Sequence, residues 1–174
     1  MTELKLEHKF DPKRFRHYLG GKVSVLHCHH YATLYSQLAE DADEMFGGIK
    51  YLVETSRDVF HGFLTDYIKS NKITDVNDRA KVVEDYWGFA GMGKLKITKK
   101  EESAGEAEMS HSHVDEGWIK KWGKRDKPVN FITQGYLAGG FAAIFDKPAD
   151  HFTVKESQAL VTGAPKSLFT ITKA

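Results

Sequence analysis

Clustered histidines are the part of this sequence that comes closest to a chemical site. Six of the nine histidines are candidates. Five lie in two clusters, His27, His29 and His30 around Cys28 and His111 with His113, and His61 beside Gly62 is a single helix position. Residues two apart on a strand point to the same side, so His111 and His113 are expected to share the face that Met109 turns toward the core. Two imidazoles buried side by side need partners, which a bound metal ion would supply.

The ion that such ligands imply is zinc or iron, because both accept imidazole nitrogen and carboxylate oxygen. A third imidazole would come from the earlier cluster and a carboxylate from the strand that follows the last helix. The predicted metal ligands are His27, His29, His111, His113 and Glu156. The alternative is that the strand ends in water at the run Ser-His-Ser-His, and the spacing matches no established metal signature.

The single cysteine, Cys28, has two interpretations. A neighbouring imidazolium from His27 or His29 would favour the thiolate, which is the nucleophilic form. Sequence neighbours on a strand point to opposite faces, however, so neither histidine needs to touch the sulfur. We therefore favour a small buried hydrophobic role for Cys28 and assign no catalytic residue. One cysteine cannot form an intramolecular disulfide, which agrees with a reducing compartment.

Aromatic side chains are the candidates for contact with a small molecule. Taken one by one, such residues are more often part of a core than of a binding site. Together they could line a flat apolar pocket suited to a ring system or a hydrocarbon chain. The predicted ligand-binding residues are Trp87, Trp118, Tyr136 and Phe141.

The elements that must position these residues are clearest between residues 129 and 172. Asn130 is suited to cap a helix that Pro148 prevents from continuing. Within this helix Gly135, Gly139 and Ala143 recur four apart. They form a ridge of minimal side chains that lets another backbone approach closely, in the same chain or across a two-fold axis.

A hairpin should follow this helix. Alternation places Phe152, Val154 and Glu156 on one face of a strand, and the turn around Gly163 leads into a second strand at residues 167–172. One carboxylate therefore shares a face with two large apolar side chains.

The rest of the chain divides by hydrophobic period into further helices and strands. The helix that starts after the first histidine cluster carries one apolar stripe, and Gly62 in the next helix is expected to permit close packing. The expected strands are residues 23–28, 95–99 and 107–113, and the expected helices are residues 31–46, 49–69, 75–87 and 115–122.

Composition narrows the class of protein. The chain has 174 residues, 41% of them hydrophobic and 28% charged, which predicts one domain over residues 1–174 with a substantial core. A net charge of +1 leaves no basic footprint for nucleic acid. We also expect no membrane span and a cytoplasmic location, because no apolar run approaches about 20 residues and the N-terminus lacks a signal-like segment.

The stretch 129–172 resembles the C-terminal half of the 4-vinyl reductase domain family, also described as hydrocarbon-binding proteins. The resemblance rests on a short glycine-rich helix motif, a glutamate that ends a strand, a glycine in a turn and an aromatic residue in the closing strand. These residues are Gly135, Tyr136, Leu137, Ala138 and Gly139, then Glu156, Gly163 and Phe169. Where that family commonly carries two cysteines, this chain has Ala159 and Ser167, so thiol chemistry is lost there.

A second resemblance lies in the first two long helices. Their sequences are similar to the amino-terminal helices of the L-2-amino-thiazoline-4-carboxylate hydrolase group. The pattern of a histidine before the first helix and a glycine within the second fits His30 and Gly62.

Both resemblances imply an α+β fold in which an antiparallel sheet packs against several helices in two layers, as in the small subunits of the TRAPP complex. The function they imply is that of a homodimeric binding protein, which holds an apolar or aromatic molecule between helices and sheet, with or without a metal. One alternative is a metal-assisted reductase or ring-opening hydrolase acting on a small cyclic substrate. Another is an interaction subunit that meets its partner through a helix. Fold analogy alone does not establish function.

Overall fold

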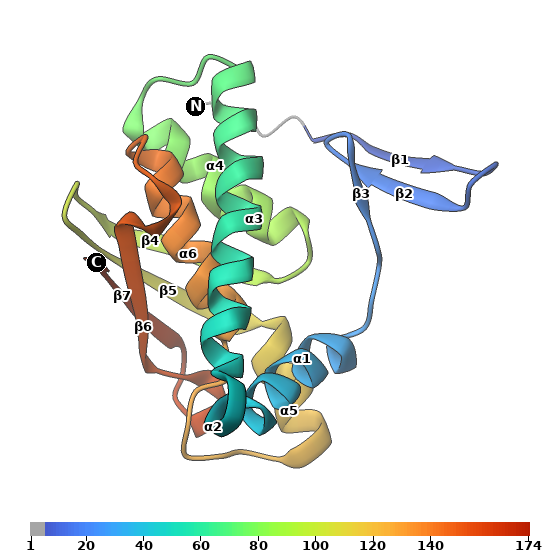
Figure 1. Cartoon of the computed structure of the whole chain (residues 1–174), viewed down its shortest axis with the longest axis vertical. Helices are drawn as coiled ribbons and strands as arrows, with labels where there is room; N and C mark the ends of the chain where they lie inside the picture. Colours follow the sequence, from blue (N-terminus) through green and yellow to red (C-terminus); the bar gives the residue numbers. More distant parts are fainter. Residues whose placement is uncertain (1–5) are drawn as a thin grey trace.

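The main sheet has four antiparallel strands in the order β4-β5-β7-β6 in the computed structural model, which describes residues 6–174 (Figure 1). The strands are β4 (Gly93–Lys100), β5 (Ala104–Ser112), β6 (Phe152–Gln158) and β7 (Ser167–Lys173). β4 and β5 form one hairpin, and β6 and β7 pair through the turn region that contains the short 3-10 helix η2 (Leu160–Thr162). β5 and β7 join the two pairs.

Three helices lie on one side of this sheet, two of them against the strands and the third on top of another helix. They are α3 (Gly48–Ser70), α4 (Val76–Phe89) and α6 (Phe131–Ile144). α6 lies between α3 and the strands β6 and β7, and α4 packs along β4 (Figure 1). The core between these helices and the sheet therefore includes both faces of α6, of which 12 of 14 residues are buried. The prediction of an α+β fold with an antiparallel sheet packed against helices is confirmed.

Glycines set the close approach of α3 and α6. A Cβ atom at Gly135 would lie 2.2 Å from the carbonyl oxygen of Val53, and one at Gly139 would lie 2.4 Å from that of Arg57. The predicted ridge thus packs against a helix of the same chain. Gly62, by contrast, has no atom within 4 Å of an added Cβ, so its predicted role in close packing is wrong.

A second group of elements lies at the N-terminal end of α6. It contains α1 (His29–Asp41), α2 (Asp43–Phe46) and α5 (His113–Trp122). The short 3-10 helix η1 (Ala149–His151) is not part of this group and directly precedes β6. Ser36 of α1 donates a hydrogen bond of 2.9 Å to the Val129 carbonyl, and Ser56 of α3 donates one of 2.7 Å to the Ile132 carbonyl. These two bonds fix the start of α6 against the helices that precede it in the chain.

A small three-stranded antiparallel sheet projects from the helices at the start of the described chain (Figure 1). Its strands are β1 (His8–Asp11), β2 (Arg16–Leu19) and β3 (Lys22–Ser24). Sequence analysis predicted only one strand here, at residues 23–28, and most of that range is the segment that leads to α1. Among residues 6–174 no helix is both long enough and apolar enough to cross a membrane.

Candidate functional site

The first histidine cluster meets His113 where the N-terminal ends of α1 and α5 pack together. A Cβ atom at Gly117 of α5 would lie 2.9 Å from both the Cβ and the carbonyl oxygen of His29, so the two helices approach closely at this point. His113 lies one turn earlier on α5. Its ring centroid is 5.8 Å from that of His27 and 5.9 Å from that of His29.

Burial and like charge both disfavour protonation of His113. Burial, followed by the nearby His27 and His29, lowers the pKa of His113 below the ordinary histidine value. The Nε2 atom of His29 is buried and has no hydrogen-bond partner among the described residues. His113 therefore favours the neutral imidazole, the form that accepts hydrogen bonds or coordinates metals.

His111 does not join this cluster, and the prediction that it faces inward with His113 is wrong. Lys94 pairs with His111 while Leu95 pairs with Met109, so Ser110 is an extra residue in a β-bulge. The bulge shifts the alternation, and the His111 side chain is 72% exposed beside Glu116. His113 begins α5 and belongs to no strand.

Glu156 belongs to a separate buried polar network. Asn130, which precedes α6, donates from its side-chain amide to Asp115 at 2.6 Å and to Glu156 at 2.7 Å. Asp115 also accepts a hydrogen bond of 3.0 Å from the backbone N–H of Val161. Ser112 donates to the Asn130 side-chain oxygen at 2.9 Å. This network connects the starts of α5 and α6 with β6 and η2.

The two carboxyl groups of the network have raised pKa values. Burial, followed by the proximity of Asp115, raises the pKa of Glu156 to about 7, although hydrogen bonds from Asn130 oppose the change. Burial likewise raises the pKa of Asp115. At neutral pH the network therefore retains a proton, because two buried carboxylates that share one amide repel each other.

The five predicted metal ligands thus do not form one site. His27, His29 and His113 are close together, while His111 faces outward and Glu156 bonds to Asn130. Within residues 6–174 no group of three or more His, Cys, Asp or Glu side chains is placed to hold a metal ion. A zinc or iron ion at the three clustered histidines stays a prediction, which metal analysis of the purified protein and of a His113→Ala variant tests.

Cys28 is exposed, so its predicted role as a small buried hydrophobic residue is wrong. It occupies the N-cap position of α1, and no strand includes it. Its sulfur lies 3.6 Å from Nδ1 of His30. Cys28 precedes the first turn of α1, and burial in this helix begins only at Ala32, so the Cys28 side chain remains in solvent.

Trp87 and Tyr136 form the centre of a buried aromatic group between α3, α4 and α6. Both side chains are fully buried, with ring centroids 4.2 Å apart. Phe60 lies 4.9 Å from Tyr136 in an edge-to-face contact. The Tyr136 hydroxyl donates to the Val83 carbonyl at 2.5 Å. The Trp87 Nε1–H is also buried, but it has no hydrogen-bond acceptor among the described residues.

The other two predicted ligand-binding residues lie elsewhere. Phe141 packs on β5, where a Cβ atom at Gly105 would come within 2.2 Å of its ring. Trp118 belongs to the smaller core cluster around α5 and lies 4.6 Å from the guanidinium of Arg125. That guanidinium also makes a two-point ion pair with Glu40 at 2.7 and 2.9 Å. Trp87, Tyr136 and Phe141 therefore belong to the main core, and Trp118 belongs to the second, smaller one.

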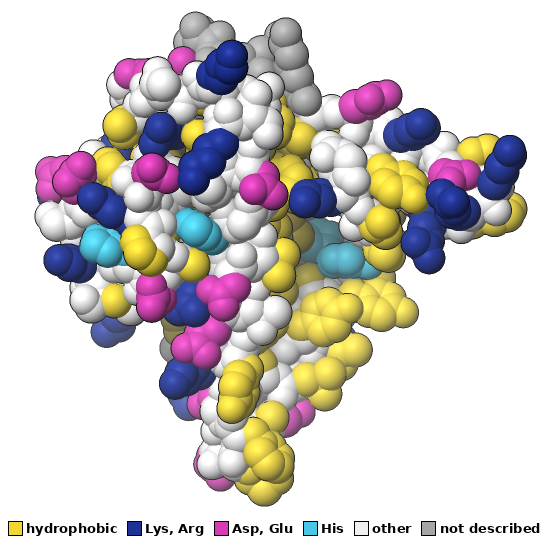
Figure 2. All heavy atoms as spheres, turned by 45° about the horizontal axis from the view of Figure 1, so that its top comes forward, with side chains coloured by type: hydrophobic (Ala, Val, Ile, Leu, Met, Phe, Trp, Pro, Cys, Tyr) yellow, Lys and Arg dark blue, Asp and Glu magenta, His cyan; other side chains and the backbone are white. Residues whose placement is uncertain are grey.

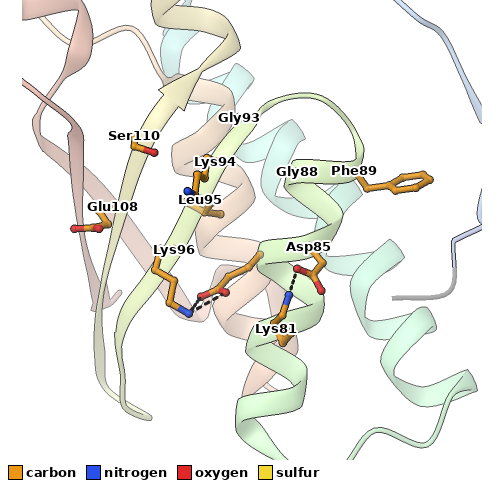
Figure 3. A pocket seen from close by; sticks show the side chains of 11 residues that line it. Lys81, Asp85, Gly88, Phe89, Gly93, Lys94, Leu95, Lys96, Glu108 and Ser110 are labelled. Carbon is orange, nitrogen blue, oxygen red and sulfur yellow. Dashed lines mark hydrogen bonds and ion pairs between the residues drawn. The ribbon is translucent and has the colours of Figure 1, made fainter. Parts of the chain in front are cut away.

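A groove of about 890 Å³ opens between α4 and β4, on the outer side of the helix that carries Trp87 (Figure 3). Leu95 gives it an apolar part, and ion pairs such as Lys81 with Asp85 line its wall. Glu84 closes α4 onto β4, because its carboxylate accepts from the Ile97 N–H at 2.8 Å and pairs with Lys96 at 3.1 Å.

Sequence reasoning missed Asp115 and Asn130 as partners of Glu156. It identified Asn130 as a capping residue and placed Asp115 at the start of a helix, so both were located correctly along the chain. Ser112 in fact caps α5, because its hydroxyl accepts from the Asp115 N–H at 3.1 Å. Asp115 is thus not needed as a cap, and Asn130, at the N-cap position of α6, makes no side-chain capping bond. Both side chains turn inward, and no local signal reveals a contact between residues 26 positions apart.

Comparison with known proteins gives a consistent fold assignment. The sensory domain of the transcription activator PoxR, solved with phenol, superposes with a TM-score of 0.75 at 14% identity, covering 95% of this chain and 84% of that chain. A vinyl-4-reductase family protein from Methanocaldococcus jannaschii gives a TM-score of 0.57 at 17% identity, covering 87% and 84%. A trafficking protein particle complex subunit 3 from Naegleria fowleri, covalently bound to palmitic acid, gives 0.55 at 8% identity, covering 84% and 94%.

No protein-family model matches the sequence, and no curated protein matches it. The chain therefore shares the fold of these three proteins, and the resemblance to the 4-vinyl reductase domain family is confirmed at the level of fold. At these identities the likeness concerns the fold alone.

Proposed function

We propose that this chain is a binding protein for a small apolar or aromatic molecule, held between α4, α6 and the sheet beside Trp87. The observation that carries the proposal is the Trp87 Nε1–H, which is fully buried among aromatic rings without an acceptor. An unpaired buried donor costs about 1–3 kcal/mol, which a ligand oxygen at this point would recover. The surrounding rings suit a flat apolar body.

The known neighbours support the same class of ligand. The PoxR sensory domain was solved with phenol and the trafficking subunit with palmitic acid, and each of these molecules joins an apolar body to an oxygen. We place the ligand entrance at the groove between α4 and β4, because α4, the helix that carries Trp87, forms one wall of this groove. Ligand entry along this route requires α4 to separate from β4 at Glu84.

The test is a titration that compares phenol with toluene by calorimetry. We expect phenol to bind roughly 5- to 10-fold more tightly, since one neutral hydrogen bond contributes about 1 kcal/mol. Trp87→Phe removes the donor while keeping an aromatic ring, so it should remove the preference for phenol. Trp122→Phe is the control, because Trp122 is 43% exposed on α5. Equal binding of both compounds by the unaltered protein would contradict the proposal.

A further inference from the structure

α1 buries its small side chains and exposes its large ones. Its buried residues are Ala32, Thr33, Ser36 and Ala39. The exposed apolar residues continue from the segment before α1 through α1 to α2. This apolar patch consists of Val25, Leu26, Tyr31, Leu34, Tyr35, Leu38, Met45 and Phe46. Hydrophobic side chains gather in the same way below the projecting sheet in Figure 2. A helix that turns its larger apolar face outward indicates a covering partner.

The projecting sheet also has an incomplete core. Phe10 is 44% exposed, Phe15 81% and Val23 57%. Three strands of three or four residues need a further apolar surface for stability. Its base is fixed to α3, where Lys22 lies 3.8 Å from Asp66. The rest of the sheet extends away from the helices (Figure 1).

These two surfaces have opposite charge. Residues 8–24, which form the sheet, contain five basic residues and one acid, a net charge of +4. The basic residues are Lys9, Lys13, Arg14, Arg16 and Lys22. Residues 29–46, which form α1 and α2, contain no Lys or Arg and four acids, a net charge of −4. The acids are Glu40, Asp41, Asp43 and Glu44. Lys22 pairs with Asp66 and Glu40 with Arg125 within the chain, so a net charge of +3 remains on the sheet and −3 on α1 and α2. The sheet and the patch are therefore complementary in both apolar character and charge.

We propose that two copies of the chain exchange these surfaces about a two-fold axis, so that the projecting sheet of each copy covers the apolar patch of the other. The exchange is reciprocal, because every copy carries one sheet and one patch, and it closes at a dimer. Both unpartnered surfaces are covered in one arrangement. The Gly135 and Gly139 ridge takes no part, since α3 of the same chain already occupies it.

The size of the patch fits a stable dimer. From the exposed fractions of its eight residues, the patch offers roughly 800 Å² of apolar side-chain surface per copy, about the area that each partner buries in a standard interface. A membrane surface suits this patch less well, because helices that lie on anionic bilayers carry Lys and Arg beside their apolar face. α1 and α2 carry acids instead.

Sedimentation of the full chain tests the proposal. We expect the unaltered protein to sediment as a dimer at about 10 μM. The double variant Tyr35→Lys with Leu38→Lys should have a dimer dissociation constant at least about tenfold higher. Val59→Lys is the matched control, because Val59 is 62% exposed on α3 and lies outside the patch. Melting curves of each variant separate loss of association from loss of folding.

Charge reversal on the sheet provides the second arm. Lys9→Glu with Arg16→Glu leaves the apolar patch intact and should weaken the dimer, and it should also flatten the decrease in affinity that added salt causes in the unaltered protein. A monomer at about 100 μM, an open series of larger oligomers, or equal association of all variants would overturn the proposal. Binding to anionic vesicles that competes with dimer formation would also overturn it, in favour of a membrane surface.

Discussion

Glu156 accepts a hydrogen bond of 2.7 Å from the side chain of Asn130, and both residues are almost completely buried. The same amide donates to Asp115 at 2.6 Å. The neutral amide of Asn130 therefore bridges two acidic groups. Among the described residues, no Lys or Arg side chain takes part in this network. This arrangement makes the stability of the protein depend on pH in a definite direction.

The first prediction concerns this pH dependence. The folded pKa of Glu156 is about 7, above the ordinary value of 4.5, so the folded state binds the proton more tightly than the unfolded state. Its contribution to stability is complete below about pH 4.5, and the free energy of unfolding should fall by roughly 3 kcal/mol as pH rises to about 7. Glu156→Gln should flatten this decrease in urea titrations between about pH 5 and about pH 8.

The control for that experiment is Glu106→Gln, which removes a carboxyl group from an exposed position on β5. It should leave the pH dependence of unfolding unchanged. A Glu156→Gln variant whose stability declines as steeply as that of the unaltered protein would show that another group carries the effect.

The second prediction concerns Asn130 itself. Asn130→Ala leaves the carboxyl groups of Asp115 and Glu156 buried without their shared donor, so we expect a loss of about 3 kcal/mol or more. Asn71→Ala removes a hydrogen bond of 2.8 Å to the Tyr67 carbonyl in an exposed setting and should cost less than about 1 kcal/mol. Chemical denaturation at neutral pH measures both. Similar losses would mean that the network contributes little.

The third prediction compares two glycines in packed helices. Gly139→Ala should cost several kcal/mol and lower the melting temperature, because the new Cβ would meet the backbone oxygen of Arg57 at 2.4 Å. Gly62→Ala adds a Cβ where no atom lies within 4 Å, and it should stabilise α3 by up to about 1 kcal/mol. Thermal unfolding distinguishes the two, and a stabilising Gly139→Ala would refute the close approach of α3 and α6.

The fourth prediction rests on the proposed ligand route. Glu84→Ala removes the group that accepts from the Ile97 N–H and pairs with Lys96, so α4 should separate from β4 more readily. We expect a loss of about 1–3 kcal/mol in stability and faster association of phenol in stopped-flow fluorescence. Lys81→Ala, which removes a surface ion pair with Asp85 in the same groove, should change neither by much. Unchanged association in Glu84→Ala would place the entrance elsewhere.

Local patterns in the sequence predicted most helices and strands of the main domain, because hydrophobic period and capping residues act over a few positions. Asp75 accepts from the N–H groups of Asn77 and Asp78 and starts α4 where it was expected. The hairpin of β6 and β7 also follows the predicted alternation, with Phe152 and Glu156 both buried. These elements agree with the fold class, which the resemblance to known families implied.

The site was less accessible, because it depends on contacts that alternation cannot describe. One extra residue, Ser110, reverses the direction of His111 and removes it from the histidine cluster. The apolar stripe of α1 predicted the helix correctly, but it did not reveal that the rest of the chain packs against the opposite side, which carries the small residues. The meeting of Asp115, Asn130 and Glu156 depends on how α5, α6 and β6 pack, which no short stretch of sequence encodes.

The burial of α6 on all sides has a consequence for the motions of the protein. Its amides lie under α3 on one side and the main sheet on the other, so they can exchange with deuterium only when the whole core opens. The projecting sheet, whose strands are largely exposed, can open locally without disturbing α6. In a deuterium-exchange time course, the amide exchange rates of α6 and of the projecting sheet should therefore differ by orders of magnitude. Exchange in α6 would measure global unfolding, and exchange in the sheet would measure how far a partner protects it.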